Sequence, residues 1–309
     1  MTALRRRPRH TIVAGAALVA LLMVSGCGSD RTQADEPAAA AATFDQALHD
    51  RLPAGILARG TVRVGGGDPY PPASFFAPDG RTIVGFEPDL AAALGRVLGV
   101  RFEFVNVDFT DLLPQLNSHK IDVAMASMTD NAEREQRADF VNYFQAGTSI
   151  IVQRGNPQGI SALKDLCGKV VAVEEQTTQV DLLRRTQKGC EGGKKIAIRT
   201  YGDNANALLQ LRTGRAVAVL SDYPPAVHVS TDQRTSAHYQ LAASTQYEPS
   251  PYGIAVAKDQ TELREVVRDA MERVMRSGEY ADVLQRWGVP SGALESATIN
   301  AGGTATSAG

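Results

Sequence analysis

Apolar and polar residues alternate along the middle of the chain with two spacings. Apolar residues at every second position, or in short runs, predict β-strands, and apolar residues three or four positions apart predict α-helices. These elements follow one another as strand, helix, strand, helix, strand, and a second such series begins after a break at 155–157. Strands are predicted at 61–65, 101–107, 121–126, 169–173, 196–201, 216–220 and 253–257, and helices at 88–98, 110–118, 178–186, 204–212 and 261–277.

Alternating strands and helices are typical of α/β folds, in which helices cross over a doubly wound sheet. Two successive α/β series predict two lobes, and the cleft between two lobes is a natural site for a small molecule. The length that remains after the N-terminal segment, some 280 residues, is enough for two such lobes with real cores.

The N-terminal segment, residues 1–26, has the pattern of an export signal. Arg5 to Arg7 precede a short apolar run at 11–24, and small residues lead to Cys27. The run is shorter than the roughly 18 to 20 residues that a membrane-spanning helix needs. The ending Val24-Ser25-Gly26-Cys27 resembles a bacterial lipobox, in which the cysteine is diacylated after cleavage. The alternative is an uncleaved anchor, and both place most of the chain outside the cytoplasm on a membrane.

Composition narrows the classes of partner. The chain has a formal net charge of −2, and loss of the four arginines that precede Cys27 would bring it to −6, which disfavours nucleic-acid binding. Residues 27–45 have no apolar periodicity and predict a flexible tether. Residues 289–309 are similarly poor in core residues and predict a disordered tail.

Two cysteines remain once Cys27 is assigned to the lipid. Outside the cytoplasm, Cys167 and Cys190 are expected to form a disulfide, although two buried free thiols are the alternative. The five histidines are scattered and none lies at ligand spacing from a cysteine, so we expect no metal site.

Two segments have residues suited to ligand binding. Gly65-Gly66-Gly67 follows a strand, but Tyr70 and the nearby prolines break the dinucleotide fingerprint, so the loop is read as a rigid support for Tyr70. The second segment runs from Ser127 to Arg134 and combines hydroxyls with a guanidinium, which suits a carboxylate. By itself, an arginine in a charge-rich run such as 133–139 more often lies on a solvated helix face. We find no catalytic triad.

Motifs in the same order as in a known family extend over 61–288. Each is weak alone, but about ten of them lie in sequence without large gaps. Together they resemble the amino-acid-type solute-binding proteins of ABC importers (bacterial extracellular solute-binding family 3). The motifs include Val64-Gly65 with Tyr70-Pro71-Pro72, Gly85-Phe86-Glu87, Asp108-Phe109, Lys120-Ile121-Asp122, Met128-Thr129, Glu133-Arg134, Gly168-Lys169, Gly214-Arg215, Tyr252-Gly253 and Gly278 with Tyr280.

The resemblance implies a type II periplasmic-binding-protein-like fold, with a doubly wound mixed sheet in each lobe and a two-segment hinge. Lobe one is expected at 46–149 and 254–288, the hinge at 150–155 and 251–255, and lobe two at 156–250. The implied function is capture of a polar amino acid by a lipid-anchored extracytoplasmic monomer, which delivers it to an ABC permease that works with a cytoplasmic ATPase. No cofactor is implied.

The resemblance also implies roles for single residues. Arg134 would bind the ligand α-carboxylate, Asp222 would bind the α-ammonium, and the aromatic residues would pack on the ligand side chain. The expected ligand-binding residues are Tyr70, Phe109, Ser127, Met128, Thr129, Arg134, Thr177, Thr178 and Asp222. The family often has Gly-Thr where this chain has Gln176-Thr177-Thr178. Many relatives have a polar or acidic residue before the aromatic residue, where this chain has Gly67 and Asp68, so side-chain specificity does not transfer.

Two alternatives belong to other functional classes. The same module serves as a sensing domain, which here would need a separate membrane receptor. A few proteins of this fold are enzymes such as cyclohexadienyl dehydratase, and Glu174 or Glu175 would then supply the carboxylic acid. We expect binding without catalysis.

Overall fold

The structure is a computed structural model that describes residues 41–67 and 69–303. These residues lie within one compact unit, Ala39–Gly309. Cys27, the predicted signal peptide and the predicted tether as far as residue 40 lie outside the described residues. Within 41–67 and 69–303, no helix combines the length and the apolar character needed to span a bilayer.

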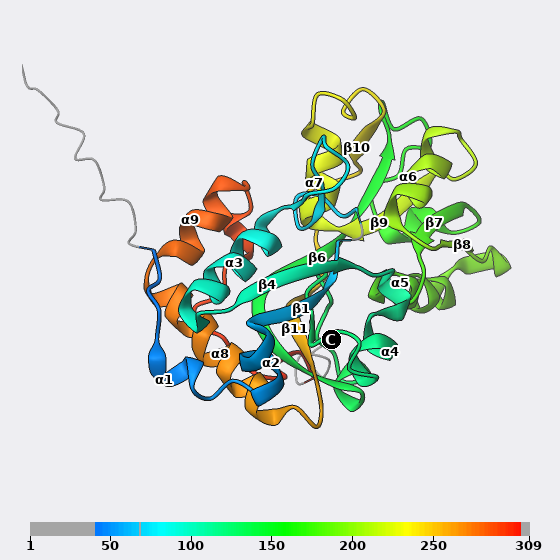
Figure 1. The fold of residues 1–309 in the computed structure, drawn as a ribbon. Helices are drawn as coiled ribbons and strands as arrows, with labels where there is room; N and C mark the ends of the chain where they lie inside the picture. Colours follow the sequence, from blue (N-terminus) through cyan, green and yellow to red (C-terminus); the bar gives the residue numbers. More distant parts are fainter. Residues whose placement is uncertain (1–40, 68, 304–309) are drawn as a thin grey trace, which may run out of the picture. The chain divides into compact units, whose positions relative to one another are not determined.

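The described residues form α-helices, short 3-10 helices and strands (Figure 1). The strands are β1 (Thr61–Gly66), β2 (Phe75–Phe76), β3 (Ile83–Val84), β4 (Arg101–Asn106), β5 (Val123–Ala124), β6 (Ala138–Gln153), β7 (Val170–Glu174), β8 (Ala197–Tyr201), β9 (Ala218–Asp222), β10 (Tyr239–Leu241) and β11 (Tyr247–Ala257). The α-helices are α1 (Gln46–His49), α2 (Ala54–Arg59), α3 (Phe86–Leu98), α4 (Leu112–Asn117), α5 (Thr178–Thr186), α6 (Asn204–Arg212), α7 (Tyr223–Thr231), α8 (Thr261–Arg276) and α9 (Glu279–Arg286). The 3-10 helices are η1 (Phe109–Asp111), η2 (Arg134–Gln136), η3 (Leu163–Leu166), η4 (Gln187–Gly189), η5 (Glu191–Gly193) and η6 (Pro290–Gly292).

One mixed sheet connects two groups of parallel strands. Its order is β4-β1-β5-β11-β6-β9-β7-β8, with β10 added beside β6. Strand β1 pairs in parallel with β4 and β5, and β7 pairs in parallel with β8 and β9. The long strands β6 and β11 are antiparallel to each other and join the two groups. Strand β6 exchanges its partner β11 for β9 at Thr148.

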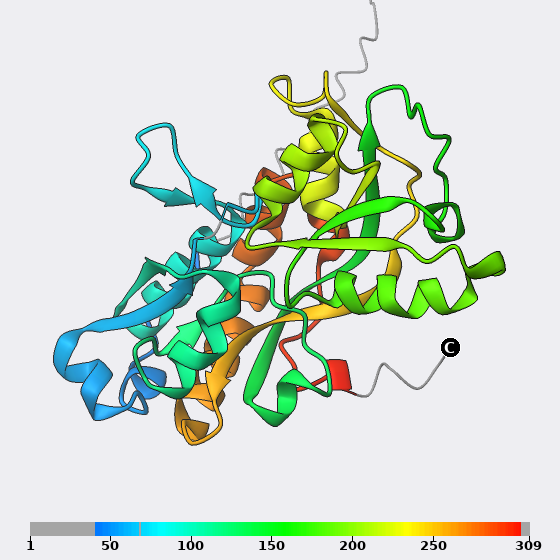
Figure 2. The ribbon, with the colours of Figure 1, turned by 90° about the vertical axis from the view of Figure 1, so that its right-hand side faces the viewer.

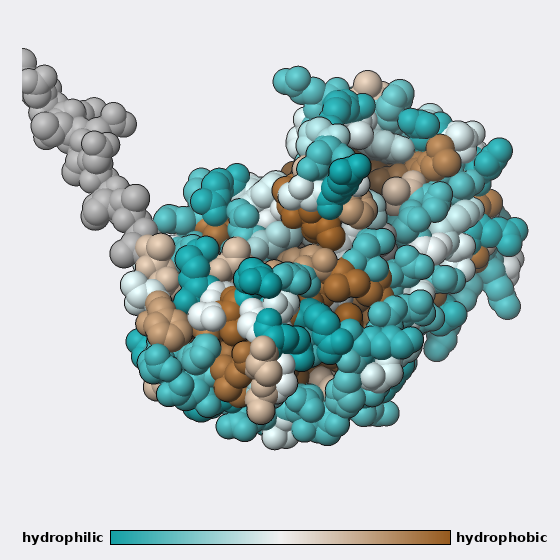
Figure 3. Space-filling view, viewed as in Figure 1, coloured by the Kyte–Doolittle hydropathy of each residue, from teal (hydrophilic) through white to brown (hydrophobic). Residues whose placement is uncertain are grey.

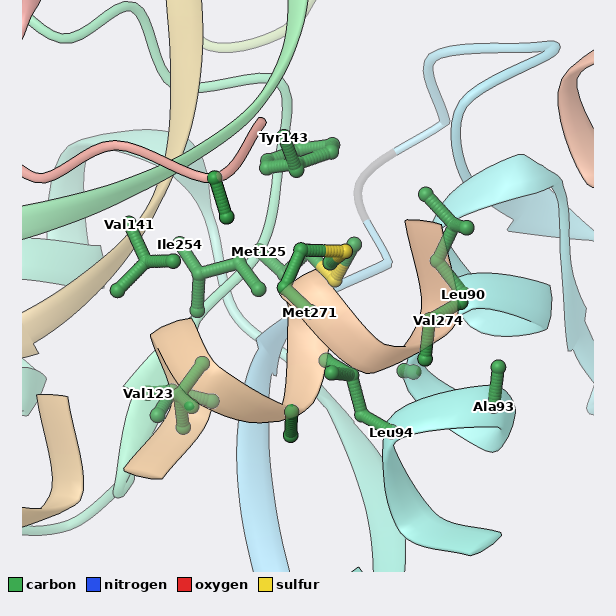
Figure 4. Packing of buried hydrophobic residues seen from close by; sticks show 14 of the residues in the cluster. Leu90, Ala93, Leu94, Val123, Met125, Val141, Tyr143, Ile254, Met271 and Val274 are labelled. Carbon is green, nitrogen blue, oxygen red and sulfur yellow. The ribbon is translucent and has the colours of Figure 1, made fainter. Parts of the chain in front are cut away.

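Each strand group has its own apolar core and its own helices. The first lobe contains β1, β4 and β5 with α1–α4, α8 and α9, and the second lobe contains β7–β9 with α5–α7. In the first lobe, Leu90 and Leu94 of α3 face Met271 and Val274 of α8 (Figure 4). Full burial of such a side chain stabilises the fold by about 1.5–3 kcal/mol. The predicted two-lobe α/β fold is therefore confirmed.

Several predicted elements agree closely with the structure. The helices predicted at 178–186 and 204–212 are α5 and α6 with the same bounds. The elements that were not predicted are helices α1, α2, α7 and α9, the short strands β2, β3 and β10, and the long strand β6. The first predicted hinge segment, 150–155, begins after the partner exchange at Thr148, and Ile150 and Val152 pack in the second-lobe core.

The C-terminal segment differs from the predicted disordered tail as far as residue 303. Its backbone is held by hydrogen bonds from the first lobe, and Ile299 forms a β-bridge with Val141. The Asn142 N–H donates to the Thr298 carbonyl over 2.8 Å, and the Gly302 N–H donates to Asp130 Oδ2 over 2.9 Å. The prediction of disorder was wrong for 289–303, because backbone and side-chain hydrogen bonds hold this segment and its few apolar residues, Val289, Ala297 and Ile299, pack on the first-lobe core.

The strand ends determine where functional side chains gather. Three polar residues lie at the carboxyl ends of strands: Ser127 shortly after β5, Glu174 at the end of β7 and Asp222 at the end of β9. In open α/β sheets, ligands bind outside the carboxyl ends of parallel strands. A second view shows the β2–β3 hairpin projecting from the first lobe (Figure 2). Most of the surface seen in Figure 3 is hydrophilic, and hydrophobic residues gather where it is hollowed.

Candidate functional site

A pocket lies between the two lobes. The first lobe supplies residues that follow β1 and β5, and the second lobe supplies the ends of β7 and β9 and the start of α5. The described residues that line it are Pro69, Tyr70, Ser74, Phe109, Ala126, Ser127, Thr129, Arg134, Glu174, Thr177, Thr178, Gln179 and Asp222. Eight of the nine residues expected from the sequence are therefore brought together here.

Met128 is the residue that the structure places elsewhere. Its side chain is 1% exposed and packs in an apolar cluster with Phe140 and Ala255. Its backbone carbonyl accepts a hydrogen bond from the Gly253 N–H over 3.0 Å. Because successive residues of this extended segment point in different directions, its neighbours Ser127 and Thr129 reach the pocket while Met128 stays in the core.

Ser127 is held in an uncommon backbone conformation by a buried carboxylate. Its φ is 50°, in the left-handed region. The Ser127 N–H and hydroxyl both donate to Glu87 Oε1, over 2.6 and 3.0 Å, and the Tyr143 hydroxyl donates to the same atom. Burial raises the pKa of Glu87, although these donors favour its charged form. Glu87 lies in the first turn of α3. This helix begins directly after Gly85, where a Cβ would meet the Ala73 carbonyl oxygen at 2.0 Å.

Arg134 reaches across the pocket between the two lobes. One terminal nitrogen donates to the Thr129 carbonyl over 2.8 Å, and the other donates to the Gln176 carbonyl of the second lobe over 3.0 Å. The guanidinium carbon lies 5.3 Å from the centre of the Phe109 ring, a cation–π distance. Burial lowers the pKa of Arg134 to about 10, so the side chain is still a cation at neutral pH.

Tyr70 and Asp222 form the second contact between the lobes. The Tyr70 hydroxyl donates to Asp222 Oδ2 over 3.1 Å and accepts from the Asp222 N–H over 3.0 Å. Gln179 Nε2 donates to Asp222 Oδ1 over 2.6 Å. Burial raises the pKa of Asp222 to about 6, against the hydrogen bonds and the charge of Arg134, which lower it. Burial, followed by the charges of Asp222 and Glu174, raises the pKa of Tyr70 well above its usual value.

Some pocket residues were not expected as ligand-binding residues. Gln179 directly follows the expected Thr177 and Thr178, so the start of α5 was the available signal. Glu174 is the last residue of β7 and was considered only as an acid for catalysis. Ser74, Pro69 and Ala126 had no signal beyond their proximity to expected residues.

The cysteine pair lies apart from the residues that line the pocket. Cys167 and Cys190 form the expected disulfide, with their Cα atoms 5.6 Å apart. It links the end of η3 to the segment that follows α5, within the second lobe. We therefore assign it a structural role.

Known proteins resemble this chain over most of its length. The arginine-binding protein ArgT of Corynebacterium glutamicum is 29% identical over 252 residues, which cover 81% of each chain. The L-cystine-binding protein TcyJ of Escherichia coli K12 is 30% identical over 233 residues, which cover 75% of this chain and 84% of that protein. The solved structure of an ancestral arginine-binding protein bound to arginine has a TM-score of 0.68 and 36% identity, and the match covers 74% of this chain and 98% of that one.

A family model agrees with these individual similarities. The model that describes the bacterial extracellular solute-binding proteins, family 3, matches residues 62–290, about three quarters of the chain. The match contains the second lobe, the first lobe apart from α1 and α2, and all the described residues that line the pocket. The chain therefore belongs to the bacterial extracellular solute-binding proteins of family 3.

Proposed function

We propose that this chain is the lipid-anchored, extracytoplasmic substrate-binding protein of an ABC importer and that it binds an amino acid between its lobes. The observation that carries the proposal is the placement of Arg134 and Asp222 on opposite lobes in one pocket. An amino-acid zwitterion has one charge for each of them. Removal of both ligand charges from water is tolerable only when each is paired and hydrogen-bonded.

The remaining pocket residues have roles that suit such a ligand. Thr129, Thr177 and Thr178 supply hydroxyl or amide donors near the carboxylate bound by Arg134. The Ser127 carbonyl joins Asp222 at the α-ammonium, and the rings of Tyr70 and Phe109 pack on the ligand side chain. Both curated relatives named above are binding proteins, which supports binding without catalysis.

Ligand binding would hold the two lobes together. We move the first crossing from 150–155 to Thr148, the first residue of β6 that pairs with β9. Lobe one is then 46–147 and 254–288, and lobe two is 149–250. Hinge closure of periplasmic binding proteins around a ligand is an established type of motion. A ligand drives closure only to the extent that it binds the closed form more tightly. The closed form is then the one presented to the permease, and diacylated Cys27 keeps it at the membrane.

Ligand titration of paired variants tests this proposal. We expect Arg134→Ala and Asp222→Ala each to weaken amino-acid binding by about 2–5 kcal/mol, because each leaves a buried ligand charge unpaired. Arg137→Ala, on the same loop but outside the pocket, and the exposed Asp259→Ala serve as controls. Isothermal titration after removal of bound ligand gives the affinities. Losses below tenfold at both Arg134 and Asp222 would exclude the pocket.

A further inference from the structure

We infer that the C-terminal segment 298–303 positions the loop that contains Arg134 and in this way sets the affinity for the ligand α-carboxylate. The inference deepens the proposed function and rests on it, because it assumes that Arg134 binds this carboxylate. Gly302 and Gly303 are the positioning residues, and neither is among the described residues that line the pocket. Both lie beyond residue 290, where the family match ends.

Two consecutive N–H groups of the segment bind the loop on either side of Arg134. The Gly302 N–H donates to Asp130 Oδ2 over 2.9 Å, and the Gly303 N–H donates to Glu135 Oε1 over 2.7 Å. Asp130 precedes Arg134 in the loop, and Glu135 directly follows it in η2. The segment therefore holds the residues on both sides of the binding arginine.

The segment is itself fixed to the first lobe. Ile299 forms a β-bridge with Val141, near the start of β6. The Asn300 N–H donates to the Phe140 carbonyl over 3.0 Å, and Asn300 Oδ1 accepts from the Phe140 N–H over 2.8 Å. Because this part of β6 is buried, the segment joins the loop to the interior of the sheet.

The close approach of the segment to the loop depends on glycine. A Cβ at residue 302 would meet the Asp130 carbonyl oxygen at 2.0 Å, and a Cβ at residue 303 would meet the Glu135 carboxylate at 2.4 Å. A backbone carbonyl moves only if the loop moves with it, whereas a carboxylate can rotate away. Gly302 is therefore the more restrictive of the two positions.

The guanidinium of Arg134 takes its position from this loop. The Arg134 N–H donates to Asn131 Oδ1 over 2.9 Å, and a terminal nitrogen of its side chain donates to the Thr129 carbonyl over 2.8 Å. Two parallel charge-assisted bonds to a carboxylate need the guanidinium in one orientation. Such a geometry is kept when the residues behind it are locked by their own hydrogen bonds.

Titration calorimetry with the full chain tests the inference by comparing an amino acid with its α-carboxamide, which has a neutral group in place of the α-carboxylate. The common L-amino acids and L-cystine are titrated first, and the tightest binder is compared with its carboxamide. On the unmodified chain we expect the amino acid to bind about 10–100-fold more tightly than the carboxamide, the range of a charge-assisted hydrogen bond.

Gly302→Ala should reduce this preference, because its methyl group pushes the loop away. We expect the affinity for the amino acid to fall about tenfold and that for the carboxamide to fall less than about threefold. A variant that only loosened the fold would weaken both probes equally. Urea unfolding shows whether the variant is folded under the conditions of the titration.

Two further glycine variants complete the series. Gly303→Ala should lower the affinity for the amino acid by about threefold, because the Glu135 carboxylate can turn away, and it decides the matter if Gly302→Ala folds poorly. Gly202→Ala is the matched control. This glycine is exposed in the second lobe, and a Cβ there would meet no atom within 4 Å. Both affinities should stay within about twofold of the unmodified chain.

Arg134→Ala separates the inference from the proposed function, because it should abolish the preference for the amino acid over its carboxamide. If it does so while Gly302→Ala and Gly303→Ala keep the preference, the inference is overturned and the proposed function stands. Equal losses for both probes in Gly302→Ala would also overturn the inference alone. If the preference survives in Arg134→Ala, or if no amino acid of the panel binds, the proposed function is overturned and the inference with it.

Discussion

The two loops that face each other across the pocket hold their strained residues by different means. Ser127 follows β5 with φ 50°, and Gln176 follows β7 with φ 57°, so each places a non-glycine residue in the left-handed region. Ser127 is buried and donates two hydrogen bonds to the buried Glu87. The Gln176 side chain is exposed, and its carbonyl accepts from Arg134 of the opposite lobe.

A second buried carboxylate strengthens the first-lobe loop. Asp130 Oδ2 accepts hydrogen bonds from Asn142 Nδ2 and from the Gly302 N–H of the C-terminal segment. The loop that contains Ser127, Thr129 and Arg134 is therefore held by Glu87 and Asp130 on the side away from the pocket, without any contribution from a ligand. A preorganised wall costs less ordering free energy on binding than a mobile one. The second-lobe loop is held otherwise, by the hydrogen bond from Arg134 to the Gln176 carbonyl and by that from the Thr177 hydroxyl to the Glu174 carbonyl.

Among the substitutions that test this difference between the two loops, removal of the Glu87 carboxylate should change the free energy of unfolding most. Glu87→Ala leaves the Ser127 N–H, its hydroxyl and the Tyr143 hydroxyl without their acceptor in a buried site. We expect the free energy of unfolding to fall by about 2–5 kcal/mol. Urea unfolding at pH 7 measures it. The control Glu103→Ala, at a carboxylate that is 54% exposed, should change it by less than about 0.5 kcal/mol, and an equal loss in both would refute the anchoring role.

Asp130 should make the stability of the fold depend on pH. Burial is the main cause that raises the pKa of Asp130 from 3.8 to about 6, and the neighbouring Glu135 acts in the same direction. A carboxyl with a raised pKa in the folded state stabilises the fold below its ordinary pKa and loses this contribution as the pH rises through about 6. Asp130→Asn should therefore gain on the order of 1–3 kcal/mol relative to the unmodified chain between pH 4 and pH 7.

Urea unfolding at pH 4, 5, 6 and 7 measures the difference in the free energy of unfolding between Asp130→Asn and the unmodified chain. Glu103→Gln, at an exposed carboxylate that pairs with an arginine, is the control and should show no such trend. A difference between Asp130→Asn and the unmodified chain that is the same at pH 4 and pH 7 would show that Asp130 does not carry this pH dependence.

The elements with a regular apolar pattern could be predicted, and those that depend on their surroundings could not. Helices α5 and α6 show their apolar face in the sequence and were predicted to the residue. Strand β6 lies between β11 and β9 and is buried on both faces, so polar residues such as Asn142 and Ser149 interrupt any alternation. Helix α7 begins at Tyr223 and has Pro224 and Pro225 in its first turn. Two prolines argue against a helix in a sequence, although the first turn tolerates proline.

The pocket was predictable in so far as it uses residues at strand ends and in family motifs. Arg134, Asp222 and the threonines of α5 were identified in this way, and the structure brings them together. Glu87 was visible as part of a motif, but its bonds to Ser127 depend on how α3 packs against the end of β5. The attachment of Gly302 to Asp130 joins residues 172 positions apart and has no signature in hydropathy.

Glycine substitution at the two strained positions should produce the smallest effects, and they should have opposite signs. A left-handed conformation costs a non-glycine residue roughly 1 kcal/mol or more, and glycine relieves it at the expense of greater freedom in the unfolded chain. Gln176→Gly keeps the carbonyl that binds Arg134 and should raise the free energy of unfolding by about 0.5 kcal/mol. Ser127→Gly relieves similar strain but removes the hydroxyl bound to Glu87, and should lower it by about 1 kcal/mol. Urea unfolding of both variants under one condition gives the two values, and a shift in the same direction for both would mean that the two loops are anchored alike.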